Sequence, residues 1–206
     1  MKRLLLVATL GALLVAPAAA APPTVTLKAA PTTVTYGAAT TLSGVLSTGR
    51  AGQSIDVLAQ ECGQTAFKKV ATATTTTGGN FSVAVKPALN TNYEAKQKGA
   101  TSPIAGVKVS PLLAVKKVKL GKFTISVTAA QSFVGKFVVF QRLRSSKWVS
   151  LKHVTLRSVV AGTNGAQVSS STFRIKLPAR LRVRAVLPLT QAGSCYLAAK
   201  SKAIRS

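Results

Sequence analysis

The segments FRIKL (173–177) and LRVRA (181–185) alternate apolar and basic side chains. Successive side chains of a β-strand point to opposite faces, so this period of two predicts strands with one buried and one exposed face. The same alternation recurs at 55–59, 81–85 and 123–127, with Gly-rich turns such as GGN (78–80) between the runs. Glu is nearly absent, although soluble helices are usually rich in it. We therefore expect an all-β chain.

The strand pattern runs through the chain twice, which indicates two domains. Short strands at this spacing are typical of antiparallel sandwiches, and two sandwiches of about 90 residues each fall within the usual size of a domain. The boundary is expected at Ser110-Pro111, where a strand runs into proline without a flexible Gly/Ser linker. Such a joint limits the freedom between domains. We expect domains at 21–110 and 111–206.

Two sets of short motifs mark these domains. Residues 23–110 contain TVTL (24–27), VTYG (34–37), TLSG (41–44), KVAT (69–72), GGNF (78–81) and NTNY (90–93), and residues 111–206 contain VGK (134–136), QR (141–142), Trp148 and QAGSCY (191–196). The first set resembles the bacterial Ig-like domains of secreted actinobacterial proteins, and the second resembles a divergent copy. The resemblance implies two tandem Ig-like antiparallel β-sandwiches. It also implies a tyrosine corner at Tyr93, or else an ordinary core position.

The N-terminus has the layout of a secretory signal peptide. Lys2 and Arg3 precede an uncharged apolar run at 4–16, and small residues (18–20) follow Pro17. This predicts cleavage after Ala20, so that residues 1–20 are a signal peptide. A transmembrane anchor needs about 20 apolar residues, and this run is shorter. We expect a secreted or extracytoplasmic protein, either free or held at the cell surface, with no transmembrane segment after cleavage.

The charge is strongly positive and unevenly distributed. The chain has 28 Lys and Arg, 3 Asp and Glu, and a formal net charge of +25. All three acids (Asp56, Glu61 and Glu94) lie in the first domain, beside eight basic residues. Two basic residues belong to the signal peptide, which leaves 28 − 2 − 8 = 18 basic residues and no acid in residues 111–206. Repulsion between like charges at this density opposes folding. We therefore expect the excess of basic residues to reflect the surroundings in which the protein works.

Two clusters of basic residues are candidate binding sites for a polyanion. If the strands at 173–177 and 181–185 are neighbours, their outward side chains form one patch, and a second cluster lies at the start of the domain. Each neutralised phosphate releases a counterion, which makes such binding sensitive to salt. An anionic cell-surface polymer or glycan is the expected partner; a dedicated nucleic-acid site usually adds exposed aromatic platforms, which we do not expect here. The candidate residues are Arg174, Lys176, Arg182 and Arg184 in the first cluster, and Lys116, Lys117, Lys119 and Lys122 in the second.

The inventory of reactive residues argues against catalysis. Glycan hydrolysis needs a pair of carboxylates, and a metal site needs several His, Cys or carboxylate ligands. Asp56, Glu61 and Glu94 have the pattern of ordinary surface acids, and His153 that of a half-exposed strand residue. We therefore expect no enzyme activity, no cofactor and no metal site.

The two cysteines are Cys62 and Cys195, one in each domain. In an exported protein an even number of cysteines suggests pairing. A bond between these two would join the domains and would need Cα atoms within about 7 Å. Free thiols and disulfide-linked oligomers are the alternatives. The restricted hinge at Pro111 favours the interdomain bridge.

Two functions follow from the sequence. The first is a non-catalytic binding or adhesion module that attaches to an anionic surface through its second domain. The second is a structural spacer of the cell envelope or extracellular matrix whose charge has no specific ligand. An accessory role toward a protein partner is a third option.

Overall fold

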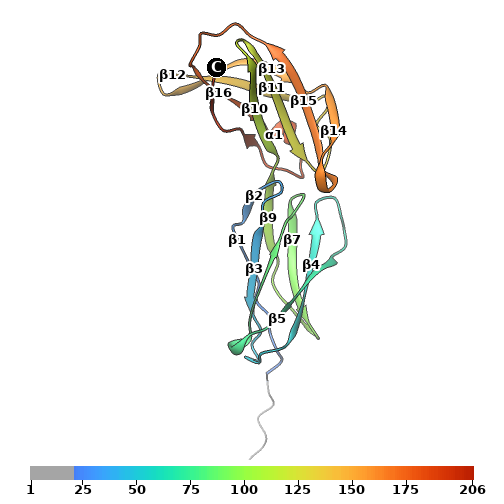
Figure 1. The fold of residues 1–206 in the computed structure, drawn as a ribbon. Coiled ribbons are helices and arrows are strands. Elements are labelled where there is room, and N and C mark those ends of the chain that lie inside the picture. The colour runs from blue at the N-terminus through green and yellow to red at the C-terminus, as the bar shows by residue number, and fades with distance from the viewer. Residues whose placement is uncertain (1–20) are drawn as a thin grey trace, which may run out of the picture.

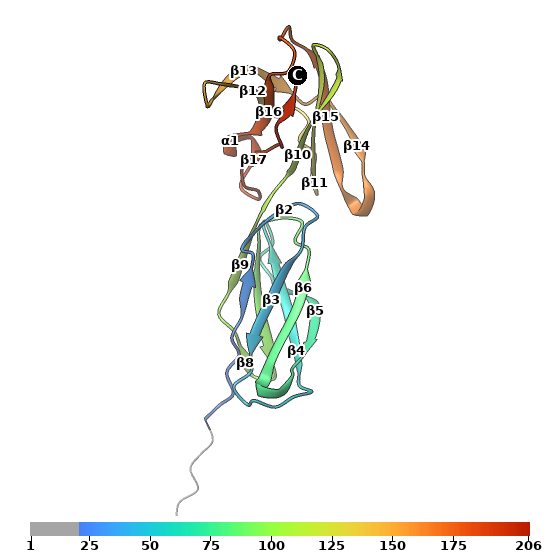
Figure 2. The ribbon, with the colours of Figure 1, turned by 60° about the vertical axis from the view of Figure 1, so that its left-hand side comes forward.

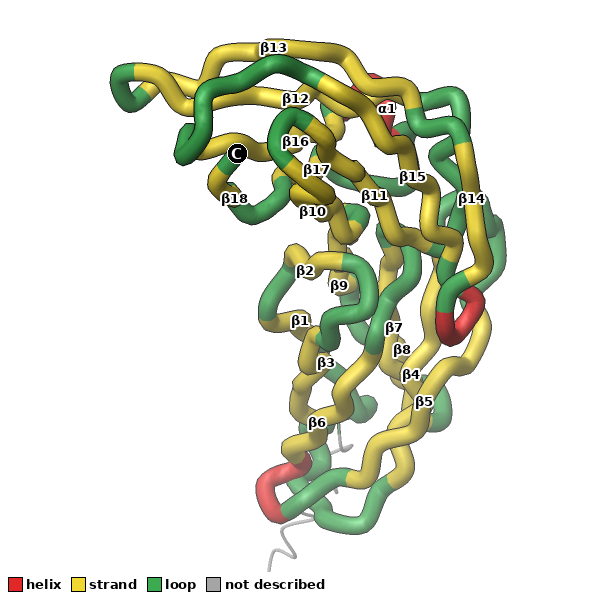
Figure 3. The backbone as a smooth tube through the Cα atoms, turned by 45° about the horizontal axis from the view of Figure 1, so that its top comes forward, coloured by secondary structure: helices red, strands yellow, loops and turns green. Residues whose placement is uncertain are grey.

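Residues 21–206 form two β-rich domains stacked end to end in a computed structural model (Figure 1). The predicted signal peptide, residues 1–20, lies outside the described residues. The expectation of an all-β chain is confirmed. Apart from strands, the described residues contain two 3₁₀ turns, η1 (Thr77–Gly79) and η2 (Thr163–Gly165), and one short helix, α1 (Leu189–Ala192), drawn red in Figure 3.

The first domain packs a sheet of order β1-β3-β6 against a sheet of order β2-β9-β7-β4-β5, in which β8 also pairs with β7. The alternating pattern at 55–59 becomes β4, where Ile55 and Val57 face the core with no exposed surface. One pair departs from the antiparallel expectation, because β2 runs parallel to β9. The strands are β1 (Lys28–Ala30), β2 (Thr33–Thr35), β3 (Thr40–Val45), β4 (Ser54–Glu61), β5 (Lys68–Thr74), β6 (Asn80–Val85), β7 (Thr91–Gln97), β8 (Ala100–Thr101) and β9 (Ala105–Ser110).

The second domain packs a sheet of order β10-β11-β15-β14 against a sheet of order β13-β12-β16-β17, and β18 also pairs with β16. Figure 2 shows the two sheets, with the β14–β15 hairpin at one side. Phe123, Phe140 and Phe173 form the aromatic centre of the core between them, with ring centroids 5.1 to 6.0 Å apart. The strands are β10 (Leu112–Lys119), β11 (Lys122–Ala129), β12 (Phe137–Arg144), β13 (Lys147–Thr155), β14 (Ser158–Ala161), β15 (Gln167–Arg174), β16 (Arg182–Leu187), β17 (Ala199–Lys200) and β18 (Ile204–Arg205).

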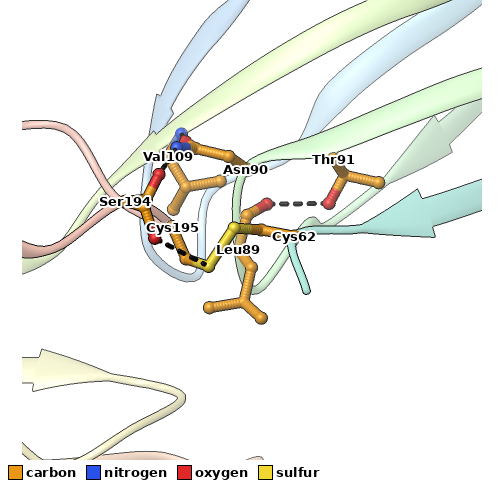
Figure 4. Close-up of a disulfide and its surroundings, with 7 residues drawn as sticks. All are labelled: Cys62, Leu89, Asn90, Thr91, Val109, Ser194 and Cys195. Carbon is orange, nitrogen blue, oxygen red and sulfur yellow. Dashed lines mark hydrogen bonds between the residues drawn. A yellow bond between two sulfur atoms is a disulfide. The ribbon is translucent and has the colours of Figure 1, made fainter. Parts of the chain in front are cut away.

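A disulfide joins the two domains, which confirms the interdomain bridge between Cys62 and Cys195 (Figure 4). Their Cα atoms are 5.4 Å apart, within the range that a disulfide requires. Cys62 follows β4, and Cys195 lies between α1 and β17. The two residues are separated by 133 positions, so the bond closes a loop that includes most of both domains.

Asn90, just before β7, holds the same junction by hydrogen bonds (Figure 4). Its main-chain N–H donates to the Cys195 carbonyl at 3.0 Å, and its side-chain Nδ2 donates to the Ser194 carbonyl at 3.2 Å. Its Oδ1 accepts from the Val109 N–H at 2.8 Å, and its carbonyl accepts from the Cys62 N–H at 2.8 Å. One asparagine therefore connects the last strand of the first domain, the cysteine loop and the second domain.

Apolar packing continues through the junction. Pro111 is buried and joins β9 directly to β10. A single buried cluster includes Val109 of the first domain together with Leu113 and Tyr196 of the second. The Leu197 N–H also donates to the Val109 carbonyl at 2.8 Å. The domains therefore share part of one core instead of meeting through a solvated linker.

Tyr93 and Tyr196 are both buried, at 3% and 1% exposure. Burial raises the pKa of each phenol to about 12, because the charged phenolate loses its hydration. The Tyr196 hydroxyl accepts a hydrogen bond from the Ala130 N–H at 2.9 Å. Tyr93 belongs to the buried core cluster, and none of the side-chain hydrogen bonds found among residues 21–206 joins its hydroxyl to the main chain, so Tyr93 occupies the ordinary core position and not a tyrosine corner.

The disulfide gives a first prediction. Without reductant, denatured protein is expected to show no reactive thiol, and reduction is expected to release two. Replacing both cysteines (C62S with C195S) removes a constraint on the unfolded chain and is expected to lower the free energy of unfolding by about 2–4 kcal/mol, measured by denaturant titration. Thiols that react in unreduced, denatured monomer would contradict the bridge.

The buried tyrosines give a second prediction. Between pH 10 and about 12 the unfolded chain releases phenolic protons that the folded protein retains, so the free energy of unfolding falls by about 1.4 kcal/mol per pH unit for each of the two residues. In the folded protein, the phenolate absorbance of Tyr93 and Tyr196 is expected to rise only near pH 12. The variants Y93F and Y196F should each remove part of this late rise. A titration complete by pH 11 would show that these phenols are not buried.

Candidate functional site

The first predicted cluster of cations does not form one patch. Arg174 lies at the end of β15, whereas Arg182 and Arg184 lie on β16, in the opposite sheet. The condition for a single patch, that these two strands are neighbours, is therefore not met. Alternation tells which side chains face outward, but not which strand lies alongside. Here β15 ends at Arg174, and residues 175–181, with Pro178 among them, cross from one sheet to the other.

Part of the first cluster instead joins the second on the outer face of the β10-β11-β15-β14 sheet. Lys119 of β10 is paired in register with Lys122 of β11, and Lys122 is paired with Arg174 of β15. These three residues, which we call the cationic row, lie side by side across three strands. Lys116 is exposed nearer the junction. Lys117, which is paired in register with Phe123, and Lys176, two residues beyond Arg174, are also exposed.

The cationic row lies at the end of the second domain that points away from the first. β10 starts at Leu112, next to the junction, and ends at Lys119. A strand advances about 3.3 Å per residue, so Lys119 lies about 23 Å further along the strand axis than Leu112. In Figure 1 the turn between β10 and β11 lies at the top, opposite the first domain. The row is therefore on the far tip of an elongated molecule.

Arg184 is held by neighbours on its own sheet. Its guanidinium lies 4.0 Å from the centroid of the Trp148 ring, and its Nε donates to Oε1 of Gln141 at 2.9 Å. Partial burial lowers the pKa of this arginine. Among the predicted cations, Arg184 therefore stabilises its own sheet through Trp148 and Gln141. Arg182, in contrast, is exposed and paired in register with Arg205.

Aromatic side chains mostly face the core, but two are only partly buried on the β13-β12-β16-β17 sheet. Trp148 packs against Arg184, and Phe137 stacks on His153 with ring centroids 4.7 Å apart. His153 is exposed, as its strand position indicated. This surface is not evident from the sequence, because the pairing of β12 with β13, which brings these residues together, leaves no mark in the pattern of a single strand.

The acids lie away from the basic tip. Lys69 Nζ is 2.6 Å from Asp56, and Lys96 Nζ is 2.8 Å from Oε1 of Glu94. Glu94 is only 8% exposed, so the expectation of an ordinary surface acid is wrong for this residue. Within residues 21–206 no three His, Cys, Asp or Glu side chains gather closely enough to hold a metal ion.

No protein-family model matches the sequence, and neither does any curated protein. Among solved structures, the chain is similar to the crystal structure of a tetra-tandem repeat in the extending region of a large adhesion protein, with a TM-score of 0.37 and 13% identity. That likeness covers 90% of this chain and 49% of the other, so the chain spans about half the length of its neighbour. None of the helices found between residues 21 and 206 has the length and apolar character to cross a bilayer.

The fold and the site define a class of protein. The described chain consists of two β-rich domains, tethered by a disulfide and by Asn90, and its second domain carries cations without a single acid.

The contacts of Arg184 give a third prediction. The variant R184Q loses the cation–π contact and a hydrogen bond of a charged donor, and we expect it to lower the free energy of unfolding by about 1–2 kcal/mol. Trp148 is the only tryptophan of the chain, so its fluorescence reports the change directly. The matched control is R182Q on the same strand, which removes an exposed charge opposite Arg205 and should leave stability unchanged or slightly higher. Equal losses in both variants would contradict the role of the Trp148 contact.

Proposed function

We propose that this protein is a non-catalytic, extracytoplasmic binding module that attaches to an anionic cell-surface polymer through its second domain. The observation that carries the proposal is the cationic row, Lys119, Lys122 and Arg174, on a domain with no acid. No carboxylate of that domain's own side chains competes for these cations. A polymer with regularly spaced phosphates or sulfates would therefore meet several cations on one face.

The geometry of the whole molecule supports the same proposal. The first domain extends the molecule. Because its net positive charge is smaller, the electrostatic attraction for a polyanion is concentrated on the second domain. Because the disulfide and Asn90 fix the junction, the first domain holds the basic tip at a set distance instead of on a loose tether. This is an arrangement suited to presenting a binding surface.

A spacer without a specific ligand is the second candidate. The observation that favours it is the same stiff junction, since the shared core and the disulfide make the two domains one elongated unit. The two candidates differ in one measurable property: a spacer needs no salt-sensitive affinity for a polyanion beyond that of any basic protein.

The test is binding of residues 21–206 to heparin and to polyphosphate over a range of salt. Replacing the cationic row (K119Q, K122Q and R174Q together) is expected to make the slope of log K against log salt less negative by about 3 and to weaken binding to both polymers. The matched control replaces three exposed lysines of the first domain, Lys28, Lys68 and Lys86, by Gln. If both triple variants lose the same affinity, binding follows net charge alone and the spacer is the better account.

A further inference from the structure

The turn at the tip exposes apolar side chains among the cations. Val118 and Leu120 are 52% and 65% exposed, and Leu120 is the most exposed large apolar side chain of residues 21–206. They belong to the segment KKVKLGK (116–122), whose remaining residues are four lysines and Gly121. Neither apolar side chain contributes to the core, and a soluble polyanion would gain nothing from them.

An open apolar groove lies beside this turn. It has a volume of about 630 Å³ and is formed between Leu120-Gly121 and the segment 174–178. Its apolar lining is Leu120, Ile175, Leu177 and Pro178, and its two charged residues are Arg174 and Lys176.

The groove is already formed in the folded protein. The Ile175 N–H donates to the Gly121 carbonyl at 3.0 Å, which fixes the turn against the segment after β15. Gly121 has φ +70°, and a Cβ there would lie 3.2 Å from the Ile175 carbonyl oxygen. Glycine is therefore needed at this position both for the backbone conformation and for the close approach.

Five lysines and one arginine lie on the same elements as the apolar residues of this tip. Six cations lie on the strands and segments that carry the turn and the groove, and residues 111–206 contain no acid. A surface on which exposed apolar side chains alternate with cations matches the interface of a bilayer that contains acidic lipids, where phosphates lie above the acyl chains. The six are Lys116, Lys117, Lys119, Lys122, Arg174 and Lys176.

We propose that the tip docks on the surface of a lipid bilayer rich in acidic lipids. Val118 and Leu120 enter the boundary between headgroups and acyl chains, the groove accepts apolar lipid surface, and the surrounding cations contact phosphates. The proposal rests on the proposed function, because it uses the cationic row, but it names a ligand that is both anionic and apolar. The tip position fits this role, since the first domain lies on the opposite side and does not block approach to a flat surface (Figure 1).

The test compares vesicles with a soluble polyanion, using residues 21–206, which form the two folded domains. Binding to vesicles of mixed phosphatidylglycerol and phosphatidylcholine, measured by co-sedimentation, is expected to exceed binding to phosphatidylcholine alone by at least about tenfold. The variant V118S with L120S keeps every charge and is expected to weaken vesicle binding about tenfold while heparin binding stays unchanged. Both residues are exposed in a turn, so the fold is expected to persist, and L120S alone should give an intermediate loss.

The matched control is V159S with V160S on the edge strand β14, which removes two valines exposed at 41% and 62% away from the tip. It is expected to bind both vesicles and heparin as the unchanged protein does. Unchanged vesicle binding by V118S with L120S, or equal binding to neutral and acidic vesicles, would overturn the lipid proposal and leave polymer binding standing. Failure to bind heparin, polyphosphate and acidic vesicles alike would overturn both proposals.

Discussion

The junction between the domains is the constraint on which the rest of the structure depends. A chain break or a flexible hinge at Pro111 would leave two small domains, each with an exposed apolar end. Instead Asn90 satisfies four polar groups at once, the Cys62–Cys195 bond crosses the same space, and Val109, Leu113 and Tyr196 bury the apolar ends against each other. Burial of polar groups is tolerated only where partners are supplied, and Asn90 supplies them.

The stiff junction also makes sense of the charge distribution. Eighteen basic residues without an acid repel one another, and this repulsion opposes a compact second domain. Alternation limits the cost, because residues such as Phe123 and Val183 are fully buried while the charged neighbours on their strands reach solvent. The shared core and the disulfide join the second domain to the first and so add to its stability. In the first domain, Asp56 and Glu94 form ion pairs with Lys69 and Lys96. The molecule can thus present an excess of positive charge without losing its fold.

Prediction from sequence succeeded where the physics is local. Period-two alternation identified the strands and their outward faces, because side-chain direction along a strand depends only on neighbouring residues. It failed for the strand partners of the basic segments: β15 and β16 are in different sheets, so Arg174 lies beside Lys122 and not beside Arg182. Glu94 was also missed: it lies on β7, inside the sheet and opposite Leu58 of β4, and is only 8% exposed, which the local pattern around a single acid does not indicate. Neither α1 nor the role of Asn90 has a distinctive local pattern.

The sequence by itself determined the all-β class, the absence of acid from the second domain and the possibility of a single disulfide between domains. Each of these depends on composition or on the nearest neighbours in the chain. Only the tertiary structure decided that Cys62 and Cys195 meet, that Arg184 packs on Trp148, and that the cations of β10, β11 and β15 lie around an exposed Leu120. The physical reason is that these contacts join residues far apart in the chain, and such contacts depend on sheet order and on the path of loops such as 175–181.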